Sequence, residues 1–67
     1  MGEIIKKLRE EKRMSQEELA EAAGISRPTL SMIELGKAGS VRTGTLEAIA
    51  KALGVSVSVF FANTVSL

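Results

Sequence analysis

The chain contains no cysteine, no histidine and no aspartate, and its only aromatic residues are two phenylalanines. Without cysteine or histidine, neither a disulfide framework nor a usual zinc site can form, so the sequence predicts no metal and no cofactor. The hydrophobic core must therefore come from aliphatic side chains. The acidic residues are all glutamate, and Ala, Leu, Glu and Lys are abundant. This composition favours helices.

Long apolar runs are also missing. No stretch approaches the roughly 18 residues needed to span a bilayer, and the N-terminus leads directly into a charged segment without a signal-peptide core. We therefore expect a cytoplasmic protein that makes no membrane contact. With 67 residues, the chain is expected to form one small domain, residues 1–67. The formal net charge of +1 says little about nucleic acid, because the distribution of charge over the surface decides such binding.

Groups that commonly carry catalysis are equally scarce. The chain offers no His, Cys or Asp, no glycine-rich loop that would cradle a phosphate, and no serine next to a base. A nucleophile needs such a neighbour to be activated. We therefore predict that the protein is not an enzyme and has no catalytic residue.

Apolar residues recur at helical spacing along most of the chain, which predicts an all-α fold. In the second predicted helix, the apolar face consists of Leu19, Ala22 and Ala23. The spacing predicts helices over about residues 2–12, 16–23, 27–35 and 44–53.

Start and stop signals set the helix boundaries. Ser15 and Glu18 fit a capping box, in which each side chain bonds the backbone amide of the other. Ser26 and Thr43 are the expected N-caps of the third and fourth helices. Gly24 ends the second helix, because glycine tolerates the left-handed backbone of a tight turn.

The segment after the fourth helix allows two interpretations. Residues 55–59 alternate valine and serine, a pattern typical of a strand. A serine could instead cap a short helix over about residues 57–61, which we favour because a lone strand has no partner unless a second copy supplies it. The predicted fold is thus a compact bundle of four to five helices.

The second and third predicted helices and the short turn between them have the form of a helix-turn-helix. At these residues the sequence resembles the lambda-repressor (Xre, Cro-like) family of helix-turn-helix DNA-binding domains. The resemblance lies in Ser15-Gln16-Glu17-Glu18-Leu19-Ala20, Gly24-Ile25-Ser26-Arg27, Ile33-Glu34, Gly36-Lys37 and the segment 45–55. It implies a lambda-repressor-like bundle that binds double-stranded DNA sequence-specifically as a small transcriptional regulator, expected to be a repressor.

The resemblance implies that helix 27–35 enters the major groove while helix 16–23 lies across the phosphates. Arg27 is the leading candidate for a base contact, since its planar fork suits guanine. It could also contact phosphate alone, which would contribute affinity without specificity. The other candidates for base contact are Thr29, Ser31 and Met32. The sequence departs from the family at Met32 and Leu35, where apolar side chains replace the usual polar ones and leave base reading by Met32 in doubt.

Phosphate contacts are expected from residues at the helix starts and in the loop after residue 35: Gln16, Ser26, Lys37, Ser40 and Arg42. Gln16 matches a family position at which the side chain and the helix N-terminus hold a phosphate. The less favoured alternatives are that Gln16 is an ordinary exposed residue of the first turn and that the loop is an ordinary solvated loop. Arg9 and Glu34 match a partly buried ion pair between the first and third helices in relatives, the alternative being that each is solvated by itself.

The C-terminal apolar residues Val57, Val59, Phe60 and Phe61 are expected to complete the core or to form a dimer contact. A twofold homodimer would place two recognition helices roughly 34 Å apart on a palindromic operator. The alternative function is a protein-binding regulatory module or an antitoxin-like partner. Such a module would dock through Met32, Leu35 and the C-terminal apolar segment.

Overall fold

The protein folds as a bundle of four α-helices followed by a 3-10 helix, as seen in a computed structural model that describes residues 1–64 and the side chains of residues 1–61. The elements are α1 (Gly2–Glu11), α2 (Gln16–Ala23), α3 (Arg27–Glu34), α4 (Thr43–Leu53) and η1 (Val57–Thr64). The described residues contain no strand. The predicted all-α fold is confirmed, and the bounds of the four α-helices agree with the prediction to within one residue.

Local capping explains where the central helices begin and end. The Ser15 hydroxyl accepts from the Glu18 amide at 3.0 Å, while Glu18 Oε1 accepts from the Ser15 amide at 2.8 Å, so the predicted capping box is present. Gly24 ends α2 with a φ of 73°, in the left-handed region. Thr43 is not a cap: Arg42 holds that position without a side-chain hydrogen bond.

The core draws on every element. Its buried members are Ile5, Leu19, Ala20, Leu30, Ile33, Leu46, Ile49, Ala50, Leu53 and Phe60. The predicted apolar face of α2 was wrong at Ala22, which is exposed, whereas Ala20 is buried. The cause is that α3 and α4 both pack on the side of α2 that carries Leu19 and Ala20, which leaves Ala22 outside the contact.

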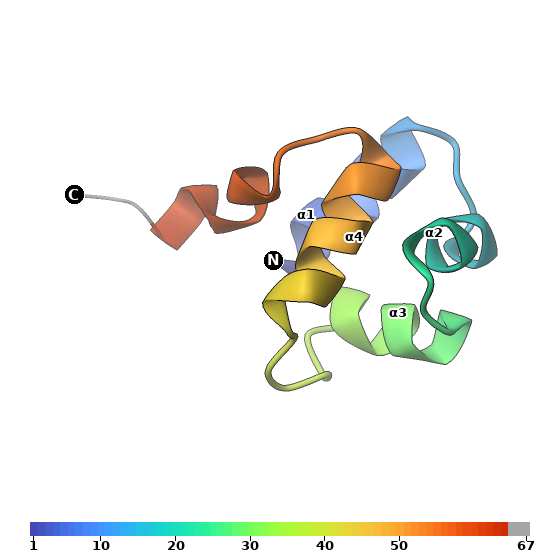
Figure 1. The fold of residues 1–67 in the computed structure, drawn as a ribbon, viewed down its shortest axis with the longest axis horizontal. Coiled ribbons are helices and arrows are strands. Elements are labelled where there is room, and N and C mark those ends of the chain that lie inside the picture. The colour runs from blue at the N-terminus through green and yellow to red at the C-terminus, as the bar shows by residue number, and fades with distance from the viewer. Residues whose placement is uncertain (65–67) are drawn as a thin grey trace.

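Helices α2 and α3 lie next to each other and are joined by a short turn, while α4 crosses the centre of the bundle (Figure 1). Helix α1 packs against the far end of α3. None of the helices in the described residues is long and apolar enough to cross a membrane.

The segment after Gly54 forms a helix, as favoured, and the strand alternative is wrong for the described residues. Its geometry is 3-10 and it continues to Thr64, beyond the predicted end at residue 61. Ser56 starts it, since its carbonyl accepts from the Val59 amide at 3.0 Å. Residues 65–67, which the predicted single domain includes, lie outside the described residues.

Candidate nucleic-acid interface

A buried ion pair joins α1 to the end of α3. Arg9 Nε donates to Glu34 Oε2 at 2.7 Å, and Arg9 Nη2 donates to Glu34 Oε1 at 3.1 Å. The two residues are only 9% and 7% exposed. Arg9 Nη1 also donates to the Met14 carbonyl at 2.9 Å, which ties the α1–α2 turn to the pair. This two-point contact is the strongest form of side-chain ion pair, and it is the pair expected from the sequence.

The surroundings of Glu34 act in opposite directions on its ionisation. Burial, the largest single influence, raises the pKa of the Glu34 carboxyl. Hydrogen bonds from Arg9 and Gln16, together with the positive charges of Arg9 and Lys6, outweigh it and hold the pKa below its usual value. The hydrogen bond to Glu34 is also the main reason why the pKa of Arg9 is raised. Glu34 is therefore a carboxylate at neutral pH.

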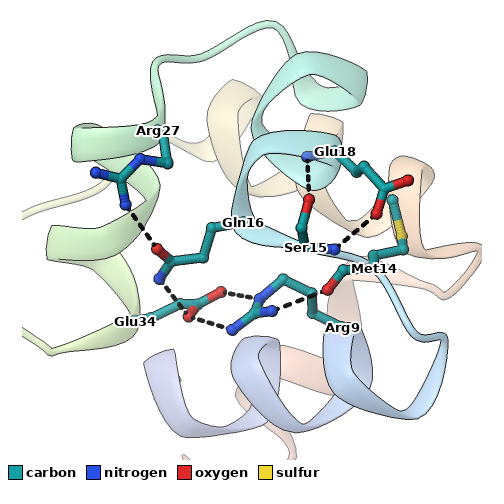
Figure 2. A network of polar contacts seen from close by, with 7 residues as sticks. All are labelled: Arg9, Met14, Ser15, Gln16, Glu18, Arg27 and Glu34. Atoms are coloured by element: carbon teal, nitrogen blue, oxygen red, sulfur yellow. Dashed lines mark hydrogen bonds and ion pairs between the residues drawn. The ribbon is translucent and has the colours of Figure 1, made fainter.

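Gln16 connects this pair to the start of α3 (Figure 2). Its Nε2 donates to Glu34 Oε1 at 3.0 Å, and its Oε1 accepts from Arg27 Nη1 at 3.2 Å. A shallow hollow lies over these groups, lined by Arg9, Ser15, Gln16, Glu17 and Arg27. The structure thus brings together a candidate phosphate contact, a candidate base contact and the ion pair, which the sequence had placed in separate roles.

The four candidate base contacts all lie on the solvent-accessible part of α3. Arg27, Ser31 and Met32 lie within about 140° of one another around the helix axis, at about 100° per residue. Arg27 and Met32 are exposed, and Ser31 is half-buried. Thr29 is exposed too, and at about 100° per residue it lies about 60° from Met32, on the side away from Ser31. Its hydroxyl is 2.7 Å from Ser26 Oγ.

Ser26 and the loop after α3 complete the set of candidate contacts. Ser26 Oγ accepts from the Thr29 amide at 3.2 Å and caps α3, so this side chain is already engaged. Ser40 and Arg42 line a second hollow between α3, the loop and α4. Lys37 is exposed and lies outside that hollow. Of the two cations in this loop, only Arg42 therefore lines the hollow.

A profile described as helix-turn-helix matches residues 5–60 of the chain. The chain belongs to the lambda-repressor type of helix-turn-helix family. The match covers all four α-helices from Ile5 onward and reaches into η1.

Two curated proteins are similar to the chain. The Immunity repressor protein of Bacillus phage phi105 is 43% identical over 58 residues, which cover 87% of this chain and 40% of that protein. The Uncharacterized HTH-type transcriptional regulator YozG of Bacillus subtilis (strain 168) is 50% identical over 42 residues, which cover 63% of this chain and 50% of that protein. The chain thus spans half or less of the length of these relatives. No solved structure matches it at a significant level.

The C-terminal apolar residues of this helix-turn-helix domain divide between two environments. Phe60 is 3% exposed and belongs to the core, and Val57 packs against that core. Val59 is half-buried, whereas Phe61 is 38% exposed. The segment therefore closes the core with one phenylalanine and presents the other at the surface.

Sequence analysis of the helix-turn-helix missed two features of the site. One is the link from Gln16 to both Glu34 and Arg27, which joins residues 18 and 11 positions apart. The other is Thr45, which lines the second hollow with Thr29, Ser40 and Arg42. No local pattern reveals either feature, because both depend on how helices cross. Among the described residues, no group of three or more His, Cys, Asp or Glu could hold a metal ion.

Proposed function

We propose that this protein binds double-stranded DNA sequence-specifically as a small transcriptional regulator, with α3 in the major groove. The observation that carries this proposal is the outward face of α3, on which Arg27 is exposed at the helix start and is held by Gln16. The family and the printed names of both relatives support DNA-binding regulation of transcription as the class of function. They also support a protein that is not an enzyme.

Two parts of the surface would hold the DNA backbone. At the start of α2, the amides of Gln16 and Glu17 have no intrahelical acceptor, which suits a phosphate. Beside α3, Lys37, Ser40 and Arg42 lie in an exposed loop. On binding, Lys37 and Arg42 would neutralise phosphates and release the counterions that surround the DNA. The affinity would therefore fall as the salt concentration rises.

The proposed form of the regulator is a cytoplasmic homodimer that represses transcription from a palindromic operator. Repression is supported by the name of the phage phi105 relative, and dimerisation by the exposed Phe61 beside half-buried Val59. A twofold axis would present two α3 helices to successive turns of the major groove. The protein is then expected to protect two symmetric half-sites.

The test is affinity for the DNA upstream of its own coding region against a random duplex, at two salt concentrations. We expect a preference of about 10³-fold or more for the specific duplex. Arg27→Ala should remove most of that preference. The matched control is Lys51→Ala, which removes one positive charge from the last turn of α4. That turn is at the opposite end of an 11-residue helix from the loop. If wild type binds neither duplex at low salt, the proposal is wrong.

A second function is favoured by one observation, the exposure of Met32 and Leu35, which are 43% and 63% exposed. These residues could dock a protein partner. Binding through such an apolar surface would change little with salt, whereas binding through phosphates would weaken steeply and log-linearly. The salt series therefore separates the two functions.

A further inference from the structure

One side chain, that of Gln16, connects the buried ion pair of Arg9 and Glu34 to the exposed start of α3. Donors and acceptors alternate along the path: Arg9 donates to Glu34, Gln16 donates to the same carboxylate, and Arg27 donates to Gln16. Figure 2 shows the four side chains in this order, with Arg9 also bonded to the Met14 carbonyl. No buried side-chain nitrogen or oxygen in the described part of the chain lacks a partner.

Glu34 determines the direction of this path. A carboxylate only accepts hydrogen bonds, whereas the amide of Gln16 has a donor at one end and an acceptor at the other. The end that faces Glu34 must therefore be Nε2, and Oε1 is turned toward Arg27 at the start of α3. The reverse orientation would set an oxygen against Glu34 Oε1, now 3.0 Å away, and an N–H against the Arg27 guanidinium.

Arg27 is held at one point and left open at others. Its Nη1 lies 3.2 Å from Gln16 Oε1, while its Nε and Nη2 form no hydrogen bond within the described part of the chain. An exposed arginine loses rotamer freedom when it binds, and an interaction that orders it beforehand reduces that cost. The open edge of the guanidinium is a pair of donors, the pattern that guanine O6 and N7 accept.

The geometry points to Glu34 as a positioning residue for base recognition: through Gln16 it holds Arg27 ready to read a guanine. This inference rests on the proposed function, since it requires α3 to lie in the major groove. It gives Gln16 a role in specificity in addition to its predicted contact with phosphate. It also predicts that one base position in each half-site depends on a side chain too deeply buried to touch DNA.

The experiment selects preferred duplexes from a randomised pool and sequences them, using the whole chain. Wild type is compared with Arg27→Ala, Glu34→Gln and Gln16→Met, each at a temperature at which thermal unfolding shows it to be fully folded. Glu34→Gln replaces two acceptors by one acceptor and one donor, so at least one of the three N–H groups aimed at this side chain loses its partner, and two of them lose it if the amide nitrogen takes the place of Oε1. Gln16→Met removes the hydrogen bonds to Glu34 and Arg27 and leaves the Arg9–Glu34 ion pair intact. This variant therefore tests the inference even if Glu34→Gln does not fold.

We expect Arg27→Ala to abolish a guanine preference at one position of each half-site, a loss of about tenfold or more. Glu34→Gln and Gln16→Met should weaken the preference at that same position by about fivefold, and leave the other positions unchanged. The matched control, Glu21→Gln, makes the same change of charge at an exposed position of α2 and should leave the selected sequence as in wild type.

Retention of the full guanine preference in both Glu34→Gln and Gln16→Met would overturn the inference, and Glu34 would then be structural alone. An equal loss of affinity for every duplex, with the guanine preference unchanged, would also overturn it and would mark Gln16 as a phosphate contact only. If wild type selects no sequence at all, the proposed function itself is wrong. This result differs from the two above, in which wild type selects a sequence and only the role of Glu34 is overturned.

Discussion

Glu34 shows how a single residue serves stability. Its carboxylate is buried, and burial of a charge without a partner is costly. Here Arg9 and Gln16 supply three N–H donors, so the carboxylate is stabilised inside the protein. Removal of the carboxylate would leave Arg9 buried with no opposite charge, which is the costly way to break such a pair.

We predict that Glu34→Gln lowers the free energy of unfolding at neutral pH by about 3 kcal/mol. The pKa of Glu34 lies below its usual value in the folded protein, so its contribution is present above about pH 4.5, the unperturbed value, and is lost as the pH falls through the folded pKa. Wild type should therefore lose more stability on acidification than Glu34→Gln. Urea unfolding as a function of pH measures both, with the exposed Glu47→Gln as control. Equal acid sensitivity in wild type and Glu34→Gln would contradict the prediction.

At the scale of elements, the approach of α1 to the end of α3 depends on a missing side chain. A Cβ at Gly2 would lie 2.3 Å from the Ile33 carbonyl oxygen and 2.7 Å from that of Glu34. Both are backbone atoms, which cannot move aside as the tip of a flexible side chain can. Any residue larger than glycine must therefore push the two helices apart.

We predict that Gly2→Ala lowers the free energy of unfolding by about 2 kcal/mol, because it overpacks this contact. The matched control is Gly44→Ala in α4, where a Cβ would meet nothing within 4 Å. Alanine favours a helix over glycine, so Gly44→Ala should raise stability by about 0.5 kcal/mol. Thermal and urea unfolding of the two variants should thus shift in opposite directions. A stabilising Gly2→Ala would show that the two helices do not approach so closely.

The starts and ends of the helices were the features best predicted from the sequence. The capping box at Ser15 and the left-handed Gly24 act within one turn of chain, so the sequence around them is sufficient to predict them. Thr43 failed as a cap because Arg42 already has the extended backbone of an N-cap. The prediction that Ala22 is buried was wrong because the positions of α3 and α4 around α2, and not the apolar pattern of α2 alone, decide which side of α2 is covered.

At the scale of the whole molecule, η1 closes the bundle with Phe60, which is 3% exposed, and presents Phe61, which is 38% exposed. We predict that Phe60→Ala lowers the free energy of unfolding by about 3 kcal/mol or more, as for other buried aromatic residues. Phe61→Ala should cost the fold much less. It should instead weaken self-association, if the proposed homodimer forms at this surface.

Urea unfolding measures the first effect, and sedimentation equilibrium over a range of protein concentrations measures the second. Equal loss of stability in the two variants would contradict the division between a core and a surface phenylalanine. A wild type that stays monomeric at all concentrations, with and without operator DNA, would contradict the proposed dimer while leaving the prediction for Phe60 in place.

The sequence by itself determined the helices and most of their ends, because these follow from periodicity and from contacts within a few residues. It indicated the family, through the resemblance of its motifs. It also indicated Arg9 and Glu34 as a pair, through the resemblance. Only the tertiary structure decided that Gln16 joins this pair to Arg27, that Thr29 lines a hollow with Arg42 and Thr45, and that Phe60 is buried while Phe61 is exposed. Each of these depends on the angle and distance at which helices cross, and those are set by packing of the whole core, which no local stretch of sequence encodes.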